Sequence, residues 1–183
     1  RLLTWVDGCV FASVSPHSPD LLFRLGELCG KLSQGLQGFD HPAAHRFLKW
    51  DPRQTNWIKD HFDKFSKERK HTVEHFFDLF SREAVPLFDQ LRQSVNYNDA
   101  NDFNVLVDAD PANPQVPGVI DFGDLVYTHT INELAIALAY AMMHKENPLE
   151  AACHVVRGYH QIFPLSETEL KVLFPLTVAR LLI

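Results

Sequence analysis

The feature that most constrains this chain is a pair of short apolar runs separated by a polar segment. The runs cover residues 104–107 and 118–121, and the ten residues between them include three prolines and show no helical period. Apolar runs that flank such a segment are typical of β-strands joined by a loop. We therefore expect a β-hairpin, in which the start of the first strand lies beside the end of the second.

Three oxygen-bearing side chains are expected to meet at one edge of this hairpin. Asn104 begins the first strand, Asp121 ends the second, and Asp99 lies in the segment that enters the same edge. Such oxygens suit Mg²⁺, which takes a few hard protein ligands and shares its shell with water and phosphates. One carboxylate remains to accept a proton from a hydroxyl group, as phosphoryl transfer requires. The competing interpretation is that all three are turn residues.

The spacing of these residues resembles the catalytic and metal-binding segments of the aminoglycoside phosphotransferase and choline kinase superfamily. The family usually has His-Gly-Asp or His-Asn-Asp, then four residues and Asn, whereas this chain has Tyr97-Asn98-Asp99 and then Asn104. Tyr97 stands where the family usually has His, and it is expected to support the catalytic loop. Residues 118–140 are most similar to the hydroxylysine-kinase-like branch and to phosphotransferase domains fused to aminotransferases.

The resemblance implies a role for each of several residues. Asp99 is expected to be the catalytic base, and Asn104 and Asp121 are expected to hold Mg²⁺, with ATP as the phosphoryl donor. Asp124 would be an accessory acid that faces the metal or a cationic substrate. Glu133, at the start of a helix, would brace the catalytic loop.

The same resemblance implies an α+β, mostly α fold: the C-terminal lobe of a protein-kinase-like fold, with helices around the small β-hairpin that carries the site. Residues 1–8 would be the inter-lobe hinge, and the main chain of Leu3 and Trp5 would hold the adenine. An edge strand is the alternative interpretation of the hinge segment. Residues 9–183 would form the lobe. The N-terminal lobe is expected outside this chain, because no glycine-rich phosphate loop occurs in the sequence, and the C-terminal end is expected outside it as well.

Helical spacing of apolar residues predicts most of the remaining structure. Ser18 and Pro19 are expected to begin the first helix, and Gly38 to end it. Pro86 should kink or divide a later helix. Further helices are expected at residues 55–65, 71–93, 133–144, 147–162 and 166–183, and residues 124–130 are expected to form a loop.

One short motif points to a different chemistry. The sequence His71-Thr-Val-Glu-His75 matches the inverted zinc-protease pattern His-x-x-Glu-His. On a helix, the two histidines would share one face as zinc ligands, Glu74 would act as a base, and Glu146 or Glu150 would complete the site. We favour a helix surface, because the motif lies in a lysine-rich stretch and no matching fold signal accompanies it.

Composition limits the classes of partner. The chain has 183 residues, of which 46% are hydrophobic, and this is enough for one sizeable core. Its net charge of −6 disfavours binding to nucleic acid. Its three cysteines show no disulfide or zinc spacing, so a reducing, cytoplasmic setting is expected. No signal peptide or membrane-spanning apolar run is evident, so no membrane partner is expected.

The sequence therefore predicts an ATP-dependent phosphotransferase lobe that acts on a hydroxyl group of a small amine-containing acceptor. Hydroxylysine, an amino alcohol or an aminoglycoside would be such an acceptor. Activity is expected to need the missing N-terminal lobe, so the fragment alone should be inactive, and a fused aminotransferase domain is a further expected partner. The alternative is a non-catalytic kinase-like module that binds or regulates within a larger protein, an interpretation that Tyr97 supports.

Overall fold

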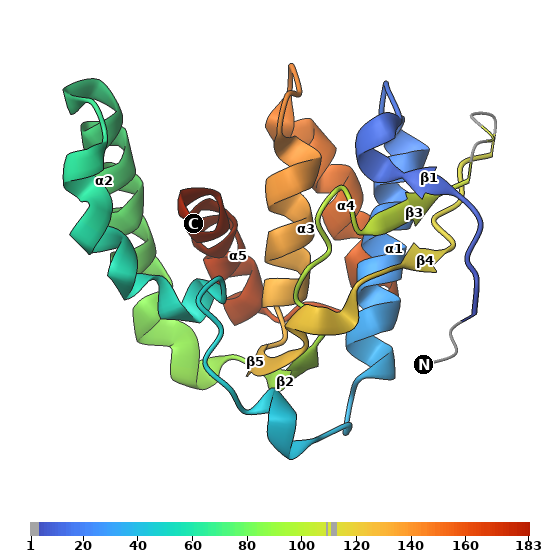
Figure 1. The fold of residues 1–183 in the computed structure, drawn as a ribbon, viewed down its shortest axis with the longest axis horizontal. Coiled ribbons are helices and arrows are strands. Elements are labelled where there is room, and N and C mark those ends of the chain that lie inside the picture. Colours follow the sequence, from blue (N-terminus) through green and yellow to red (C-terminus); the bar gives the residue numbers. More distant parts are fainter. Residues whose placement is uncertain (1–3, 109, 111–112) are drawn as a thin grey trace.

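The computed structural model describes residues 4–108, 110 and 113–183, and within these ranges the fold is mostly helical (Figure 1). The α-helices are α1 (Pro19–Gly35), α2 (Lys67–Glu83), α3 (Asn132–Met142), α4 (Pro148–Ile162) and α5 (Glu167–Leu182). The strands are β1 (Cys9–Val10), β2 (Gln93–Asn96), β3 (Val105–Val107), β4 (Gly118–Val119) and β5 (Val126–His129). The 3₁₀ helices are η1 (Phe11–Ser13), η2 (Pro42–Ala44), η3 (Pro52–Lys64), η4 (Val85–Gln90) and η5 (Phe122–Asp124).

The expected hairpin is present as two strands of a three-stranded sheet. Strand β3 pairs antiparallel with β4, with Val105 opposite Val119, and β1 pairs with the other side of β3. A hydrogen bond of 2.9 Å from the Ile120 amide to the Asn104 carbonyl extends this pairing by one step beyond the strands. The edge strand β1 begins only after residues 1–8, so the alternative of an edge strand within that segment does not hold for its described part, residues 4–8.

The expectation of a loop at residues 124–130 is wrong. Strand β5 lies in this range and pairs antiparallel with β2, with Gln93 opposite His129 and Asn96 opposite Val126. The four residues of β5 are too few to show the alternation of polar and apolar residues that marks a strand. Its partner β2 lies some thirty positions earlier, where the sequence predicts the end of a helix. The pairing matters for function because β2 leads directly into Tyr97 and Asp99.

Capping residues fix the ends of the helices largely as expected. The Ser18 hydroxyl accepts a hydrogen bond from the Leu21 amide, and Ser166 and Glu169 form a reciprocal capping box at the start of α5. The helix expected at residues 71–93 begins earlier, at Lys67, and Pro86 divides it into α2 and η4. The helix expected at residues 55–65 is the 3₁₀ helix η3, which begins at Pro52.

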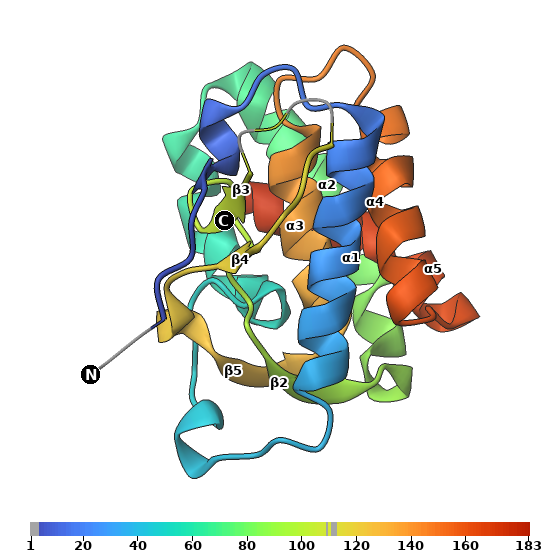
Figure 2. The same ribbon diagram turned by 90° about the vertical axis from the view of Figure 1, so that its right-hand side faces the viewer.

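The core is built where helices α1, α4 and α5 pack around α3, and α3 lies in the middle of the molecule in both views (Figures 1 and 2). Helices α1 and α4 approach so closely that a β-carbon added to Gly26 would lie 2.0 Å from the carbonyl oxygen of Val155. Helix α3 is buried on nearly all sides, including the side chain of Glu133 near its start. No described helix is long and apolar enough to cross a lipid bilayer.

Candidate active site

The proposed catalytic loop begins directly after β2, where the chain turns sharply. Tyr97 is fully buried, and Asn98 adopts a left-handed conformation with φ of 64°. Asparagine adopts this conformation more often than most non-glycine residues. The Asn98 amide donates a hydrogen bond of 3.0 Å to Oε2 of Glu133 on α3. Glu133 therefore contacts this loop, and its bracing role stays a prediction.

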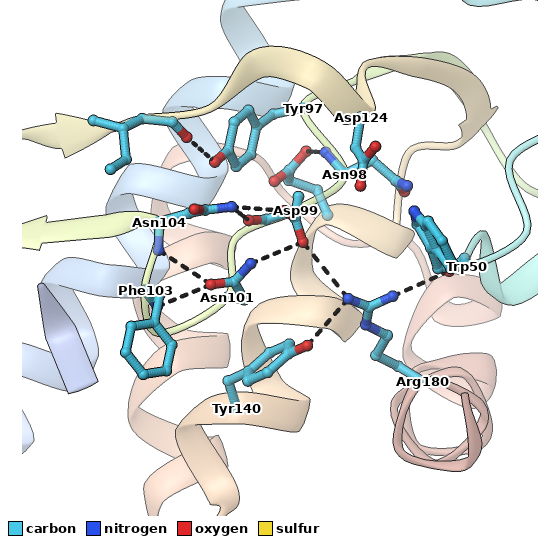
Figure 3. A network of polar contacts seen from close by, with 12 residues as sticks. Trp50, Tyr97, Asn98, Asp99, Asn101, Phe103, Asn104, Asp124, Tyr140 and Arg180 are labelled. Carbon is cyan, nitrogen blue, oxygen red and sulfur yellow. Dashed lines mark hydrogen bonds and ion pairs between the residues drawn. The ribbon is translucent and has the colours of Figure 1, made fainter.

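Asp99 and Asn104 are in direct contact (Figure 3). The Asn104 Nδ2 atom donates to Oδ2 of Asp99 at 2.6 Å and to the Asp99 carbonyl at 3.2 Å. Asn101 donates from its own Nδ2 to the other carboxylate oxygen, Oδ1, at 3.0 Å. The Asn101 side-chain oxygen in turn accepts hydrogen bonds from the amides of Phe103 and Asn104, which closes the loop. The structure thus joins two of the three residues expected to converge.

Asp121 lies one residue beyond the point where Ile120 pairs with Asn104. It has a left-handed φ of 59°, and its Oδ1 accepts a hydrogen bond of 3.0 Å from the amide of Gly123, inside η5. Among the described residues no hydrogen bond joins Asp121 to Asp99 or Asn104. Asp121 acts on Asp99 through charge instead, as the last of several causes that shift the pKa of Asp99.

The electrostatics of the site follow from burial and from the carboxylates around it. Burial is the main cause that raises the pKa of Asp99, and the charges of Asp124 and Asp121 act in the same direction. The hydrogen bond from Asn101 and the positive charge of Arg180 oppose this shift. Burial also raises the pKa of Glu133 to about 7. Asp99, Asp121 and Asp124 are therefore acidic groups whose charges act on one another, and a cation would stabilise their ionised forms.

The side chains of Asn104 and Asp121 carry the oxygen atoms that were predicted to bind Mg²⁺. The Asn104 Nδ2 donates to two oxygen atoms of Asp99, so the amide faces Asp99 with its nitrogen, and the Asn104 side chain also lies within hydrogen-bonding reach of the Tyr97 hydroxyl. The Asp121 carboxylate uses Oδ1 to accept from the Gly123 amide, and no hydrogen bond to its Oδ2 is found among the described residues. One amide oxygen and one carboxylate oxygen are the hard ligands that Mg²⁺ takes beside phosphates and water.

No set of three His, Cys, Asp or Glu side chains within the described ranges is arranged to hold a metal ion on its own. The residues of the zinc-protease motif therefore do not form such a group within the described ranges, and its His71 and His75 are exposed on α2. Glu74 pairs at 3.8 Å with Lys70 on the same helix. The structure therefore agrees with the interpretation of this motif as a helix surface.

Leu3, Trp5 and Asp124 are the other residues for which the sequence predicts a role in binding nucleotide, metal or substrate. Leu3 lies outside the described residues. Trp5 is 84% exposed, and its Nε1 donates to Oδ1 of Asp7 at 2.8 Å. Asp124 is partly buried, and its Oδ1 lies 4.0 Å from Nη2 of Arg46. The roles predicted for these residues stay predictions.

Sequence reasoning missed two arginines at the site. Arg46 donates from Nη2 to the Gly123 carbonyl at 2.5 Å and to the Leu125 carbonyl at 3.3 Å, so it holds the segment that follows Asp121. Arg180 approaches Asp99 from α5, at 3.6 Å. Both lie more than 70 positions from their partners in a chain where no local pattern marks them, so only the folded structure reveals them.

Comparison with known proteins connects this geometry to a family. The model of the phosphotransferase enzyme family matches residues 1–165. Hydroxylysine kinase from Mus musculus is 30% identical over 190 residues, covering 98% of this chain and 50% of that protein. Hydroxylysine kinase from Bos taurus is 31% identical over 191 residues, with coverage of 98% and 50%. The chain thus spans about half the length of the curated relatives that it matches.

Solved structures share the fold at lower identity. A microcompartment-associated aminopropanol kinase aligns with a TM-score of 0.65 and 20% identity, covering 89% of this chain and 52% of that one. An amicoumacin kinase in complex with AMP-PNP and Ca²⁺ aligns with a TM-score of 0.64 and 17% identity, with coverage of 97% and 53%. These likenesses concern the fold, whereas the family model covers most of the sequence. From this match we conclude that the chain belongs to the phosphotransferase enzyme family.

Proposed function

We propose that this chain carries the catalytic loop of an ATP-dependent kinase that phosphorylates a hydroxyl group of a small amine-containing acceptor. The observation that carries the proposal is the direct contact of Asp99 with Asn104 at 2.6 Å, in a chain of the phosphotransferase family. The relatives are named hydroxylysine kinase, and a solved neighbour is an aminopropanol kinase. These names support hydroxylysine or an amino alcohol as the acceptor.

In the proposed reaction Asp99 is the general base. The acceptor oxygen forms a bond to the γ-phosphorus of ATP, the bond from that phosphorus to the bridging oxygen breaks, and ADP leaves. The acceptor proton passes to the Asp99 carboxylate. Asn104 and Asn101 hold this carboxylate at both of its oxygens, so the base is oriented before the acceptor arrives.

Asn104 and Asp121 would hold Mg²⁺ through the side-chain oxygens described above. When bound, the ion would offset the negative charge of the phosphates. Asp124 would add a further negative charge for the metal or for the acceptor amine. The same proposal makes residues 1–8 the hinge between two lobes, with the main chain of Leu3 and Trp5 holding the adenine. It makes residues 9–183 the C-terminal lobe, and a preceding lobe would complete the nucleotide site. A fused aminotransferase domain stays a prediction.

The alternative, a non-catalytic module, drew its support from Tyr97 in place of His. In the structure the Tyr97 hydroxyl donates a hydrogen bond to the Ile120 carbonyl, beside the proposed metal ligand Asp121. Tyr97 thus joins the segment before Asp99 to the segment before Asp121, which is compatible with a supporting role for this residue. This geometry favours the enzyme over the module.

The proposal is tested with the full-length protein, Mg²⁺, ATP and a panel of amine-containing alcohols that includes hydroxylysine and aminopropanol. Nucleotide consumption and the formation of a phosphate ester are measured for wild type, Asp99→Asn and the matched control Asp102→Asn. Asp102 lies in the same loop, but its side chain makes no hydrogen bond or ion pair among the described residues.

We expect Asp99→Asn to lower kcat by about 10²- to 10⁴-fold with nucleotide binding retained, and Asp102→Asn to remain close to wild type. Equal turnover by wild type and Asp99→Asn would contradict the role of Asp99. Nucleotide binding without transfer to any acceptor would favour the regulatory module.

A further inference from the structure

Arg180, in the last turn of α5, brings a positive charge to Asp99 from a distant part of the sequence. Its Nη2 lies 3.6 Å from Oδ1 of Asp99 (Figure 3). The two side chains are 10% and 16% exposed, and no other ion pair among the described residues has both partners below one-fifth exposed. A pair shielded in this way is weakened by salt much less than a pair on the surface.

The Arg180 guanidinium is held in place independently of Asp99. Its Nη1 donates to the Trp50 carbonyl at 3.3 Å, and its Nη2 donates to the Tyr140 hydroxyl at 3.1 Å. The guanidinium carbon also lies 5.6 Å from the centre of the Tyr140 ring, within the range of a cation–π contact. The positive charge is therefore fixed by α3 and by the segment before η3, and it does not depend on the carboxylate for its position.

The contact with Arg180 differs in kind from the other contacts of Asp99. Asn101 and Asn104 belong to the same loop as Asp99, whereas Arg180 comes from outside it. At 3.6 Å the contact exceeds a hydrogen-bond distance, so it acts through charge. Asp121 and Asp124 raise the pKa of Asp99 through their charges, Glu133 is a third acidic group coupled to Asp99, and Arg180 is a cation that opposes them at the carboxylate.

We propose that Arg180 is a positioning residue for the catalytic base: it draws the Asp99 carboxylate toward α5 and keeps it in the orientation that receives the acceptor proton. The inference rests on the proposed function of Asp99. Arg180 acts through Asp99 and makes no contact with the reacting atoms in this scheme. Because a misplacement of about 1 Å at a reacting group can cost about 10²-fold in rate, a charge that fixes the carboxylate has a large effect on turnover.

The test compares Arg180→Met, Arg180→Lys and Arg180→Ala with Tyr140→Phe in the full-length protein, with ATP, Mg²⁺ and hydroxylysine as substrates. Tyr140→Phe removes one acceptor of the guanidinium and keeps the ring. The surface control is Arg82→Met, because Arg82 is exposed on α2 and pairs with its neighbour Glu83. Steady-state kcat and KM, rescue of Arg180→Ala by added guanidinium, and hydrogen exchange of the amides of residues 98–104 are measured.

We expect Arg180→Met to lower kcat about 10²-fold with KM for ATP unchanged. Arg180→Lys and Tyr140→Phe should show a smaller fall in kcat. Added guanidinium should restore part of the activity of Arg180→Ala. Faster exchange in residues 98–104 of Arg180→Met is expected as well. A kcat equal to that of Arg82→Met would overturn the inference, as would a change confined to KM.

Asp99→Asn is measured in parallel so that two kinds of failure can be told apart. If Asp99→Asn loses activity and Arg180→Met does not, the inference fails and the proposed function stands. If wild type shows no transfer, the proposed function fails. The hydrogen exchange of residues 98–104 is then the measurement that tests whether Arg180 positions the loop. Unchanged exchange in Arg180→Met would then contradict the positioning role.

Discussion

The Tyr97 hydroxyl donates a hydrogen bond to the main-chain carbonyl of Ile120, the residue before Asp121. This bond joins the segment that leads to the proposed base with the segment that carries a proposed metal ligand (Figure 3). The Tyr97 ring is buried and packs edge-on against Phe122, with ring centres 5.3 Å apart. A tyrosine therefore connects the two halves of the site at a position where the family usually has histidine.

Replacing Tyr97 with phenylalanine removes this bond and leaves the buried ring in place. We expect Tyr97→Phe to lower the free energy of unfolding by about 1 kcal/mol, because the Ile120 carbonyl loses its partner. Turnover should also fall, since Asp121 is then held less firmly relative to Asp99. Urea unfolding measures the first effect, with Tyr127→Phe as control because the Tyr127 hydroxyl makes no hydrogen bond among the described residues. Equal losses in both variants would argue against a special role of the Tyr97 bond.

The buried carboxyl group of Glu133 predicts a pH dependence of stability. Burial raises its pKa to about 7, from an ordinary value of 4.5. The folded state therefore holds a proton that the unfolded state releases, so this contribution to stability is complete below about pH 4.5 and is lost as the pH rises to about 7.

Glu133→Gln should remove this dependence. Between pH 5 and pH 8 we expect wild type to lose about 2–3 kcal/mol more stability than the variant. His129, whose pKa burial lowers to about 4, has the opposite trend and destabilises the fold as the pH falls, but it is common to both proteins. Urea unfolding at several pH values measures the difference, and parallel curves for the two proteins would show that Glu133 keeps an ordinary pKa.

The close contact of α1 with α4 predicts an unequal response of two glycines on one helix. Gly26→Ala would place a β-carbon 2.0 Å from the Val155 carbonyl, whereas a β-carbon at Gly35 would meet nothing within 4 Å. We expect Gly26→Ala to lose about 1–3 kcal/mol in spite of its better helix propensity, and Gly35→Ala to be neutral or stabilised by up to about 1 kcal/mol. Thermal unfolding of the two variants tests this, and similar melting temperatures would contradict the packing described.

Local signals in the sequence predicted those parts of the fold that short-range chemistry determines. Ser18 and Ser166 mark helix starts because a hydroxyl can cap free amide groups, and the hairpin follows from two apolar runs around a proline-containing segment. Pro86 was expected to divide a helix and does so. The caps and the helix break depend on residues within a few positions of one another, and the hairpin depends on two neighbouring runs joined by one short segment.

Features that depend on distant partners were not predictable in this way. Strand β5 exists because β2 pairs with it, and a four-residue run shows no pattern of its own. At the candidate site, Asp99 and Asn104 are five positions apart and their contact was expected, whereas Arg180 lies 81 positions from Asp99 and was missed. Its position follows from the packing of α5 against α3, which no motif encodes.

The most direct test of the site is the binding of Mn²⁺, a paramagnetic substitute for Mg²⁺, to the full-length protein in the presence of a non-hydrolysable ATP analogue. Electron paramagnetic resonance would follow binding to wild type, Asn104→Ala, Asp121→Asn and the surface control Asp78→Asn on α2. We expect the Asn104 and Asp121 variants to bind at least about tenfold more weakly than wild type, and Asp78→Asn to bind equally well. Equal Mn²⁺ affinity in all four proteins would contradict the assignment of these side chains as metal ligands.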